Sequence, residues 1–265
     1  MNQILTRESL LRTAPSVFTS QAHFETSDKY QQISTISIIN ALEHEGYYPV
    51  WAAQSKSRNQ EHRPFAKHLV RFRHQSNFNS RELFPELVLV NSHDGLSSYR
   101  LNAGLFRLVC SNGLVAGTTY NEVRVKHQGD ILGNVIEGTF SVAHEASALL
   151  ESAREMSAIT LNKEEKLFLA EAAHAIRFDE DSSQSLAIKP EALLYARRSK
   201  DDNNDLFTTF NIIQENVLKG GMSGYARYNG RVRRVAARQI SNIDQNIKLN
   251  KALWTLAEKM KEIKR

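Results

Sequence analysis

The chain has 265 residues, of which 41% are hydrophobic and 24% are charged, the composition of a globular protein with a packed core. Its single cysteine excludes an internal disulfide framework, no apolar run approaches the roughly 20 residues of a membrane-spanning helix, and no apolar stretch of the secretory type opens it. The net charge of +5 is mild, so the position of the cations matters more than their number.

The first half of the sequence predicts a short helix, a small antiparallel sheet and a long helix. Residues 1–30 are expected to be irregular, and a helix at 34–45 ends at Gly46. Strands and a hairpin-like apolar segment follow, and the run ELVLVN is apolar enough for a central strand. In chain order these segments are 47–54, 66–74, 86–91, 99–115 and 122–127. An amphipathic helix is expected at 131–150.

The second half predicts mostly helices. Asp205 is predicted to cap the N-terminus of the helix at 206–219, and Gly220-Gly221 is predicted to end it. The expected helices are 163–178, 190–198, 206–219 and 243–263. The fold class is therefore α+β, a small antiparallel sheet packed by a long helix and followed by a mostly helical C-terminal half. The predicted parts are an irregular N-terminal segment 1–30, an α+β core domain 31–160 and a helical region 161–265 that contains a basic Gly/Arg segment, 219–238.

The basic segment, KGGMSGYARYNGRVRRVAAR, is the least ordinary stretch of the chain. It has five arginines, one lysine, four glycines and two tyrosines, and no acidic residue lies between Glu215 and Asp244. Guanidinium groups bind phosphate oxygens bidentately, and tyrosine rings stack on unpaired bases. On a flexible, glycine-hinged segment this pattern indicates a single-stranded nucleic acid as the ligand. The candidate contact residues are Lys219, Tyr225, Arg227, Tyr228, Arg231, Arg233, Arg234 and Arg238, expected on one surface, with Arg71 and Arg73 as a possible second patch.

The same arginines have simpler explanations. The segment can be a solvated basic loop, the basic face of a strand or helix, or a partner for the acidic loops at 179–181 and 201–205. It fits neither phosphate-binding fingerprint: its lysine precedes the glycines, unlike that of a Walker A loop, and a helix stands where a Rossmann motif has a strand.

Candidate catalytic residues are few. His93 and Asp94 follow the predicted central strand, where catalytic groups are common, but SHDG is also the composition of a tight turn. The histidines lack zinc-binding spacing, no G-x-S-x-G elbow occurs, and Cys110 is expected to be a small buried hydrophobe. We therefore expect no enzyme, cofactor or metal, with a metal-dependent nuclease at His93 and Asp94 as a minor alternative.

Three blocks carry a resemblance to a known family. They begin LVLVNSHDGLSSYRLNAGLFRLVC, EVRVKHQGDILGNVIEGTF and IQENVLKGGMSGYARYNGRVRRVAAR. In this order they resemble the uncharacterised phage/plasmid-like domain family, domain of unknown function 932, of prophages and conjugative plasmids, over roughly residues 25–260. The resemblance implies a mobile-element protein in the bacterial cytoplasm, in which the basic segment is a shared feature. It brings no established activity.

The predicted element order also resembles the β-β-β-α core of Rad52-type single-strand annealing proteins, although this chain has its strongest basic cluster near the C-terminus. That resemblance implies a basic DNA groove and ring or filament assembly. The function expected from the sequence is sequence-tolerant binding of single-stranded DNA in recombination or annealing, without membrane association and with homo-oligomers possible. The alternative is a module that binds a host protein and counters or modulates host defence.

Overall fold

A computed structural model of the chain describes residues 4–24, 26, 32–57, 59–79, 83–95, 97, 99–107, 123–125, 131–178 and 187–265. The chain forms two compact units, Met1–Leu150 and Glu151–Arg265. Their boundary falls inside helix α3 (Ile131–Ser157), and the boundary predicted between residues 160 and 161 lies just beyond the end of this helix.

The first unit is built on a five-stranded antiparallel sheet in the order β1-β2-β3-β4-β5. The strands are β1 (Tyr47–Gln54), β2 (His68–His74), β3 (Leu83–Asn91), β4 (Tyr99–Arg107) and β5 (Val123–Val125). The expected central strand is confirmed, because β3 is buried on both faces along most of its length. The part of the predicted segment 99–115 that follows Arg107 lies outside the described residues, and so does Cys110.

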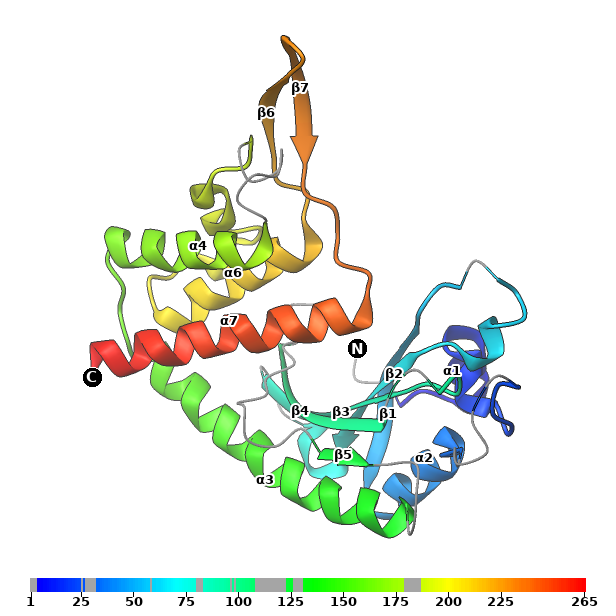
Figure 1. Cartoon of the computed structure of the whole chain (residues 1–265). Helices are drawn as coiled ribbons and strands as arrows, with labels where there is room; N and C mark the ends of the chain where they lie inside the picture. Colours follow the sequence, from blue (N-terminus) through cyan, green and yellow to red (C-terminus); the bar gives the residue numbers. More distant parts are fainter. Residues whose placement is uncertain are drawn as a thin grey trace. The chain divides into compact units, whose positions relative to one another are not determined.

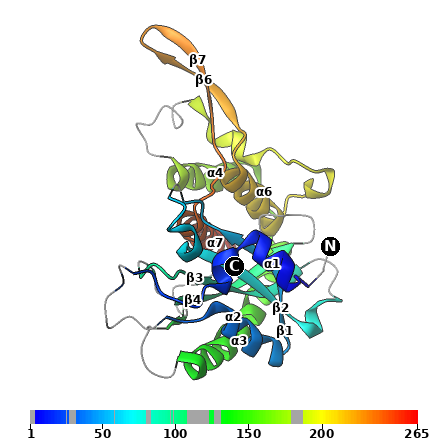
Figure 2. The ribbon, with the colours of Figure 1, turned by 90° about the vertical axis from the view of Figure 1, so that its right-hand side faces the viewer.

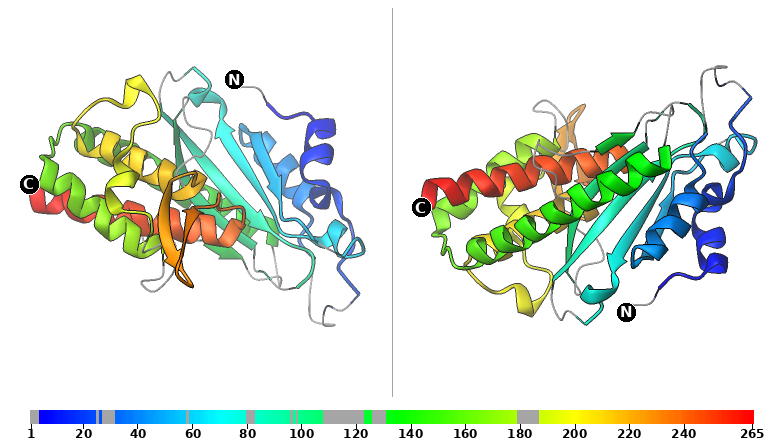
Figure 3. Two further views of the ribbon diagram at one scale, coloured as in Figure 1. Left: turned by 90° about the horizontal axis from the view of Figure 1, so that it is seen from above. Right: turned by 90° about the horizontal axis from the view of Figure 1, so that it is seen from below.

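Helices cover this sheet as the amphipathic patterns predict. Helix α2 (Thr35–His44) buries Ile38, Ile39 and Leu42, and α3 buries Val135 and Val142. Figure 1 and Figure 3 show α2 and the first turns of α3 on the same face of the sheet. Short 3-10 turns fill the connections: η1 (Pro15–Phe18), η2 (Arg63–Phe65) and η3 (Gln75–Asn77).

The N-terminal segment is more regular than the sequence predicts. Residues Arg7–Thr13 form helix α1, which begins where the Thr6 hydroxyl accepts a hydrogen bond from the backbone N–H of Ser9. Its one buried apolar side chain, Leu10, is fully enclosed. A two-turn helix with a single anchor leaves a weak periodic signal, which is why the sequence pattern does not reveal it.

The second unit is a group of helices around α6. Its elements are α4 (Lys163–Arg177), η4 (Pro190–Leu194), η5 (Ser199–Asp201), α6 (Leu206–Lys219) and α7 (Ile243–Lys264). Helix α6 is buried from Leu206 to Leu218 almost without interruption, and Phe210 meets the α7 residue Trp254 edge to face at 5.7 Å between ring centroids. The predicted limits of α6 are confirmed: Asp205 caps its N-terminus, and Gly220 ends it. The α+β fold class is thus correct.

The basic segment forms an antiparallel β-hairpin of strands β6 (Ser223–Tyr228) and β7 (Arg231–Ala236). The expectation of a flexible loop is therefore wrong, and the alternative of a basic strand is correct for β7. Figure 1 and Figure 2 show the hairpin extending away from α4 and α6 of its own unit. Within the described part of the chain, no helix combines the length and the apolar character needed to cross a membrane.

Candidate nucleic-acid interface

The root of the hairpin is fixed to the helices by backbone geometry. Gly220 adopts a positive φ of 64°, and a Cβ atom there would lie 2.5 Å from the carbonyl oxygen of Ala237. Gly221 donates its N–H to Ala237 at 2.9 Å, and Ala237 donates its own to Met222 at 2.9 Å. Because Arg177 of α4 also donates to the carbonyl of Arg238 at 3.0 Å, the two strands leave the helices with a fixed spacing and direction.

The tip of the hairpin is a two-residue turn. Asn229 and Gly230 both have positive φ, 49° and 75°, as a type I′ turn requires, and this turn matches the twist of the flanking strands. The tetrapeptide Tyr228-Asn229-Gly230-Arg231 is therefore a hairpin signal that the expectation of a flexible segment did not include.

One face of the hairpin combines aromatic, apolar and cationic side chains. Residues directly opposite each other on antiparallel strands share a face, and Tyr225 pairs with Arg234 while Arg227 pairs with Val232. Tyr225 is 74% exposed and Val232 62% exposed, although both are large apolar residues. We call these four residues the tyrosine face.

The opposite face carries Arg231 and Arg233, which are exposed and stand at alternate positions of β7. We call it the arginine face. The predicted arginines are thus gathered on one hairpin but divided between its two faces, and Arg238 lies exposed beyond the end of β7. The side chain of Tyr228 lies outside the described residues.

Two acidic residues of the 201–205 loop bind groups close to them in the sequence. Asp201 pairs with Arg198 at 3.2 Å, and Asp205 accepts the backbone N–H of Thr208 at 2.7 Å. Both carboxylates therefore have partners close to them in the sequence. The acidic loop at 179–181 lies outside the described residues.

Lys219 is not part of the exposed basic surface. Its ammonium group bonds to the carboxylate of Glu215 at 2.6 Å, and the same carboxylate receives both terminal nitrogens of Arg198, at 2.7 and 2.5 Å. Burial opposes the ionisation of Glu215, but these hydrogen bonds outweigh it, and the pKa of the carboxyl group lies below its ordinary value. Lys219 therefore completes an ion cluster at the foot of the hairpin, which corrects its predicted role.

The second predicted patch, Arg71 and Arg73, is also engaged inside the fold. The Nε of Arg71 and the Nη2 of Arg73 contact the two oxygens of Glu86, at 2.7 and 2.5 Å, and the side chain of Glu86 is fully buried. Each guanidinium also lies over a phenylalanine ring, Phe106 at 3.3 Å and Phe84 at 3.7 Å. Guanidinium groups that are buried, share a carboxylate and are covered by aromatic rings are not accessible to a polyphosphate, so the prediction of a second contact patch is wrong.

His93 belongs to a buried polar layer. Its ring lies 5.3 Å from that of His68, and both residues are fully enclosed. Hydrogen bonds join His68 to Ser16 at 2.8 Å and to Thr35 at 2.9 Å. Burial, and then the neighbouring His93, lower the pKa of His68 to about 3, so this ring is neutral at physiological pH.

Asp94 takes part in the turn that follows β3. It accepts a hydrogen bond from the hydroxyl of Ser92 at 2.6 Å, the local bonding that a tight turn favours. Among the described residues, no group of three or more His, Cys, Asp or Glu side chains is arranged to hold a metal ion.

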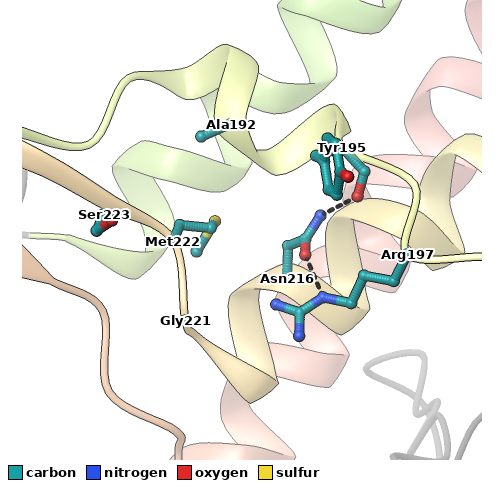
Figure 4. Close-up of a pocket in the computed structure, with 7 residues that line it drawn as sticks. All are labelled: Ala192, Tyr195, Arg197, Asn216, Gly221, Met222 and Ser223. Carbon is teal, nitrogen blue, oxygen red and sulfur yellow. Dashed lines mark hydrogen bonds between the residues drawn. The ribbon is translucent and has the colours of Figure 1, made fainter.

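A cavity of about 410 Å³, which was not predicted from the sequence, opens at the root of the hairpin. Figure 4 shows Tyr195 and Ala192, from the region of η4, on one side of it and Met222 on another, with Arg197 and Asn216 below. Its walls combine residues from 192–197 with residues from 216–223, two segments that are separate in the chain, so local patterns cannot reveal it.

Comparison with known proteins places the chain in a family. The model of the family described as "Domain of unknown function (DUF932)" matches residues 22–254. The chain belongs to this family. Two Escherichia coli K12 proteins, "UPF0380 protein YfjQ" and "UPF0380 protein YafZ", are each 41% identical to it over 254 residues, covering 96% of this chain and 90% of theirs. No solved structure matches the chain. The predicted family is confirmed, and these names assign it no activity.

Proposed function

We propose that this protein binds nucleic acid through the β6–β7 hairpin, with little sequence preference, and that its ligand is single-stranded DNA in recombination or annealing of a mobile element in the bacterial cytoplasm. The observation that carries the proposal is the hairpin itself. Arg227, Arg231 and Arg234 are exposed on a projecting ribbon, and the 28 residues between Glu215 and Asp244, which include this ribbon, contain no carboxylate.

The charge distribution favours a polyanion. A cluster of like charges on a projecting element creates a local field much stronger than the mild net charge suggests. Arginine adds a planar fork that binds phosphate oxygens in pairs and stays ionised at every physiological pH. A flexible phosphate chain can reach both faces of a ribbon two strands wide, so the arginines on each face can contribute to one complex.

The tyrosine face favours a single strand over a duplex. An exposed Tyr225 ring next to Arg234 offers a base one surface for stacking and the adjacent phosphate one cation. Stacking of this kind contributes roughly 1–3 kcal/mol per base and tolerates any sequence, because every base has a π-face. Paired bases inside a duplex keep their faces covered.

The proposal is tested by titrating the full-length protein into a labelled single-stranded oligonucleotide of mixed sequence at low salt. Changing Arg227, Arg231 and Arg234 together to glutamate should weaken binding roughly 100-fold or more, because three phosphate contacts become repulsions. Circular dichroism should show an unchanged fold.

A matched control uses one charge reversal at a time. Arg231→Glu and Lys163→Glu change the net charge equally, and both side chains are exposed in the same unit. Lys163 begins α4, whereas Arg177 at the other end of α4 contacts the hairpin root, which puts Lys163 about 20 Å away along the helix. Arg231→Glu should weaken binding several-fold more than Lys163→Glu. Equal effects, or no binding by the unaltered protein, would refute the proposal.

A further inference from the structure

The cavity at the hairpin root is continuous with the tyrosine face. Gly221, Met222 and Ser223 line it, and they are the residues that lead into β6. Ser223 shares its face of β6 with Tyr225, two residues and therefore about 7 Å further along the strand. Arg234 donates a hydrogen bond to the hydroxyl of Ser223 at 3.1 Å, so a cation of the tyrosine face stands at the mouth of the cavity.

The walls of the cavity suit a flat, partly apolar group. The methyl group of Ala192 and the thioether of Met222 lie across the space from each other, and the ring of Tyr195 borders it while remaining 74% exposed. Thioether groups and tyrosine rings both make favourable contacts with aromatic ligands. An exposed ring beside an unfilled apolar space has surface left to bury.

The polar side of the cavity is held in a fixed geometry. Asn216 is buried and donates its amide protons to the carbonyl oxygens of Leu193 and Tyr195, at 2.9 and 3.0 Å. Its own side-chain oxygen accepts the Nε proton of Arg197 at 2.7 Å, and the Nη2 of Arg197 contacts the carbonyl of Gly220. These bonds occupy one edge of the guanidinium and leave its Nη1 edge for a ligand acceptor.

We propose that this cavity binds one unstacked base of the strand held by the hairpin, an inference that rests on the proposed function. The base would lie against Tyr195 and Met222, with the donors of Arg197 reaching a carbonyl oxygen or ring nitrogen on its edge. Every base offers such an acceptor, so the contact adds affinity with little sequence preference. The volume of about 410 Å³ is in the lower part of the range of small-ligand sites, enough for a base and its sugar.

The test compares Tyr195→Ala with Tyr195→Phe in the full-length protein. The probes are a mixed-sequence single strand, a single strand of the same length made of abasic sugar-phosphate units, and the corresponding duplex. Tyr195→Ala should weaken binding of the mixed strand about 10-fold, because one stacking surface is lost, and Tyr195→Phe should bind within about twofold of the unaltered protein. Neither change should affect binding of the abasic strand or of the duplex.

A second variant fills the space directly. Ala192→Phe places a ring inside the cavity and should reproduce the loss seen with Tyr195→Ala, again on the mixed strand alone. If the mixed strand binds Tyr195→Ala as tightly as the unaltered protein, or if the abasic strand loses as much affinity as the mixed one, the base site is refuted while the hairpin proposal stands. If the unaltered protein binds none of the three probes, both proposals fail.

Discussion

Two strands of this protein carry arginines at alternate positions, β2 with Arg71 and Arg73 and β7 with Arg231 and Arg233. In β2 the two side chains are 12% and 6% exposed and share the carboxylate of Glu86. In β7 both arginines are exposed, and the partner strand β6 contains no acidic residue. The same spacing of the same residue type therefore builds a buried element paired with a carboxylate in one place and an exposed strand in the other.

The neighbouring strands make the difference. Strand β2 lies between β1 and β3, and Glu86 of β3 stands opposite Arg73 in the register. Phenylalanines of β3 and β4 then cover the guanidinium groups. The hairpin is a two-stranded sheet. The structure thus distinguishes buried, paired arginines from exposed ones, and this difference can be tested at both places.

The largest effect is expected from Glu86→Gln. This change removes the carboxylate charge that two buried guanidinium groups share, and breaking a buried ion pair in this way costs about 3–5 kcal/mol of unfolding free energy. Chemical denaturation should show the loss. The contrasting variant is Arg231→Ala, which should change stability by no more than about 0.5 kcal/mol, as exposed substitutions generally do. A loss below about 1 kcal/mol for Glu86→Gln would show that the two sets of arginines do not differ as described.

A second expected effect is the pH dependence of stability that the buried residue His68 causes. The folded-state pKa of His68 is about 3, below the ordinary value of 6.5. Between these two pH values the unfolded chain binds a proton at this ring and the folded chain does not. The contribution of His68 is therefore complete above pH 6.5 and falls with decreasing pH, by up to about 1.4 kcal/mol per pH unit.

Denaturation of the unaltered protein and of His68→Gln from pH 7 to pH 4 measures this contribution. The glutamine variant should lose less stability over this pH range, because its unfolded chain takes up about one proton fewer than the unfolded chain of the unaltered protein. Parallel curves for the two proteins would mean that His68 is protonated in the folded state, contrary to its enclosure between Ser16 and Thr35.

A smaller effect is expected from Gly230→Ala at the hairpin tip. Alanine at a φ of 75° is strained by roughly 1–2 kcal/mol, so the turn should open part of the time. Affinity for the single strand should fall a few-fold while global unfolding, followed by circular dichroism, stays unchanged. Gly230→Asn is the matched control, because asparagine tolerates positive φ and should retain binding. Equal binding by the alanine variant would show that hairpin order does not matter to the ligand.

Local patterns predicted most of the fold. The apolar runs located β1 and β3, and α6 begins and ends where Asp205 and Gly220 indicate, because capping is a property of a few neighbouring residues. Strand β7 was only one of the alternatives left open for the basic segment, and β6 was not predicted, because exposed strands have no apolar alternation.

Two features of the site could not be predicted because they depend on contacts between segments that are distant in the sequence. Whether Arg73 is free depends on its register with Glu86, 13 residues away on another strand. The engagement of Lys219 by Glu215 is a helical spacing of four residues and was visible in the sequence. The cavity requires η4 and the hairpin root to meet, which no pattern within either segment shows.

The central claim is that exposed hairpin arginines neutralise phosphates, and the dependence of affinity on salt tests it most directly. Affinity for a single strand should be measured by fluorescence anisotropy over a range of salt concentrations, for the unaltered protein and for Arg227, Arg231 and Arg234 changed to glutamine one, two and three at a time. The slope of log affinity against log salt should become shallower by about 0.7 for each arginine removed, because each phosphate contact releases condensed counter-ions. The control Lys163→Gln should leave the slope unchanged. A slope that stays constant as the three arginines are removed would contradict the account.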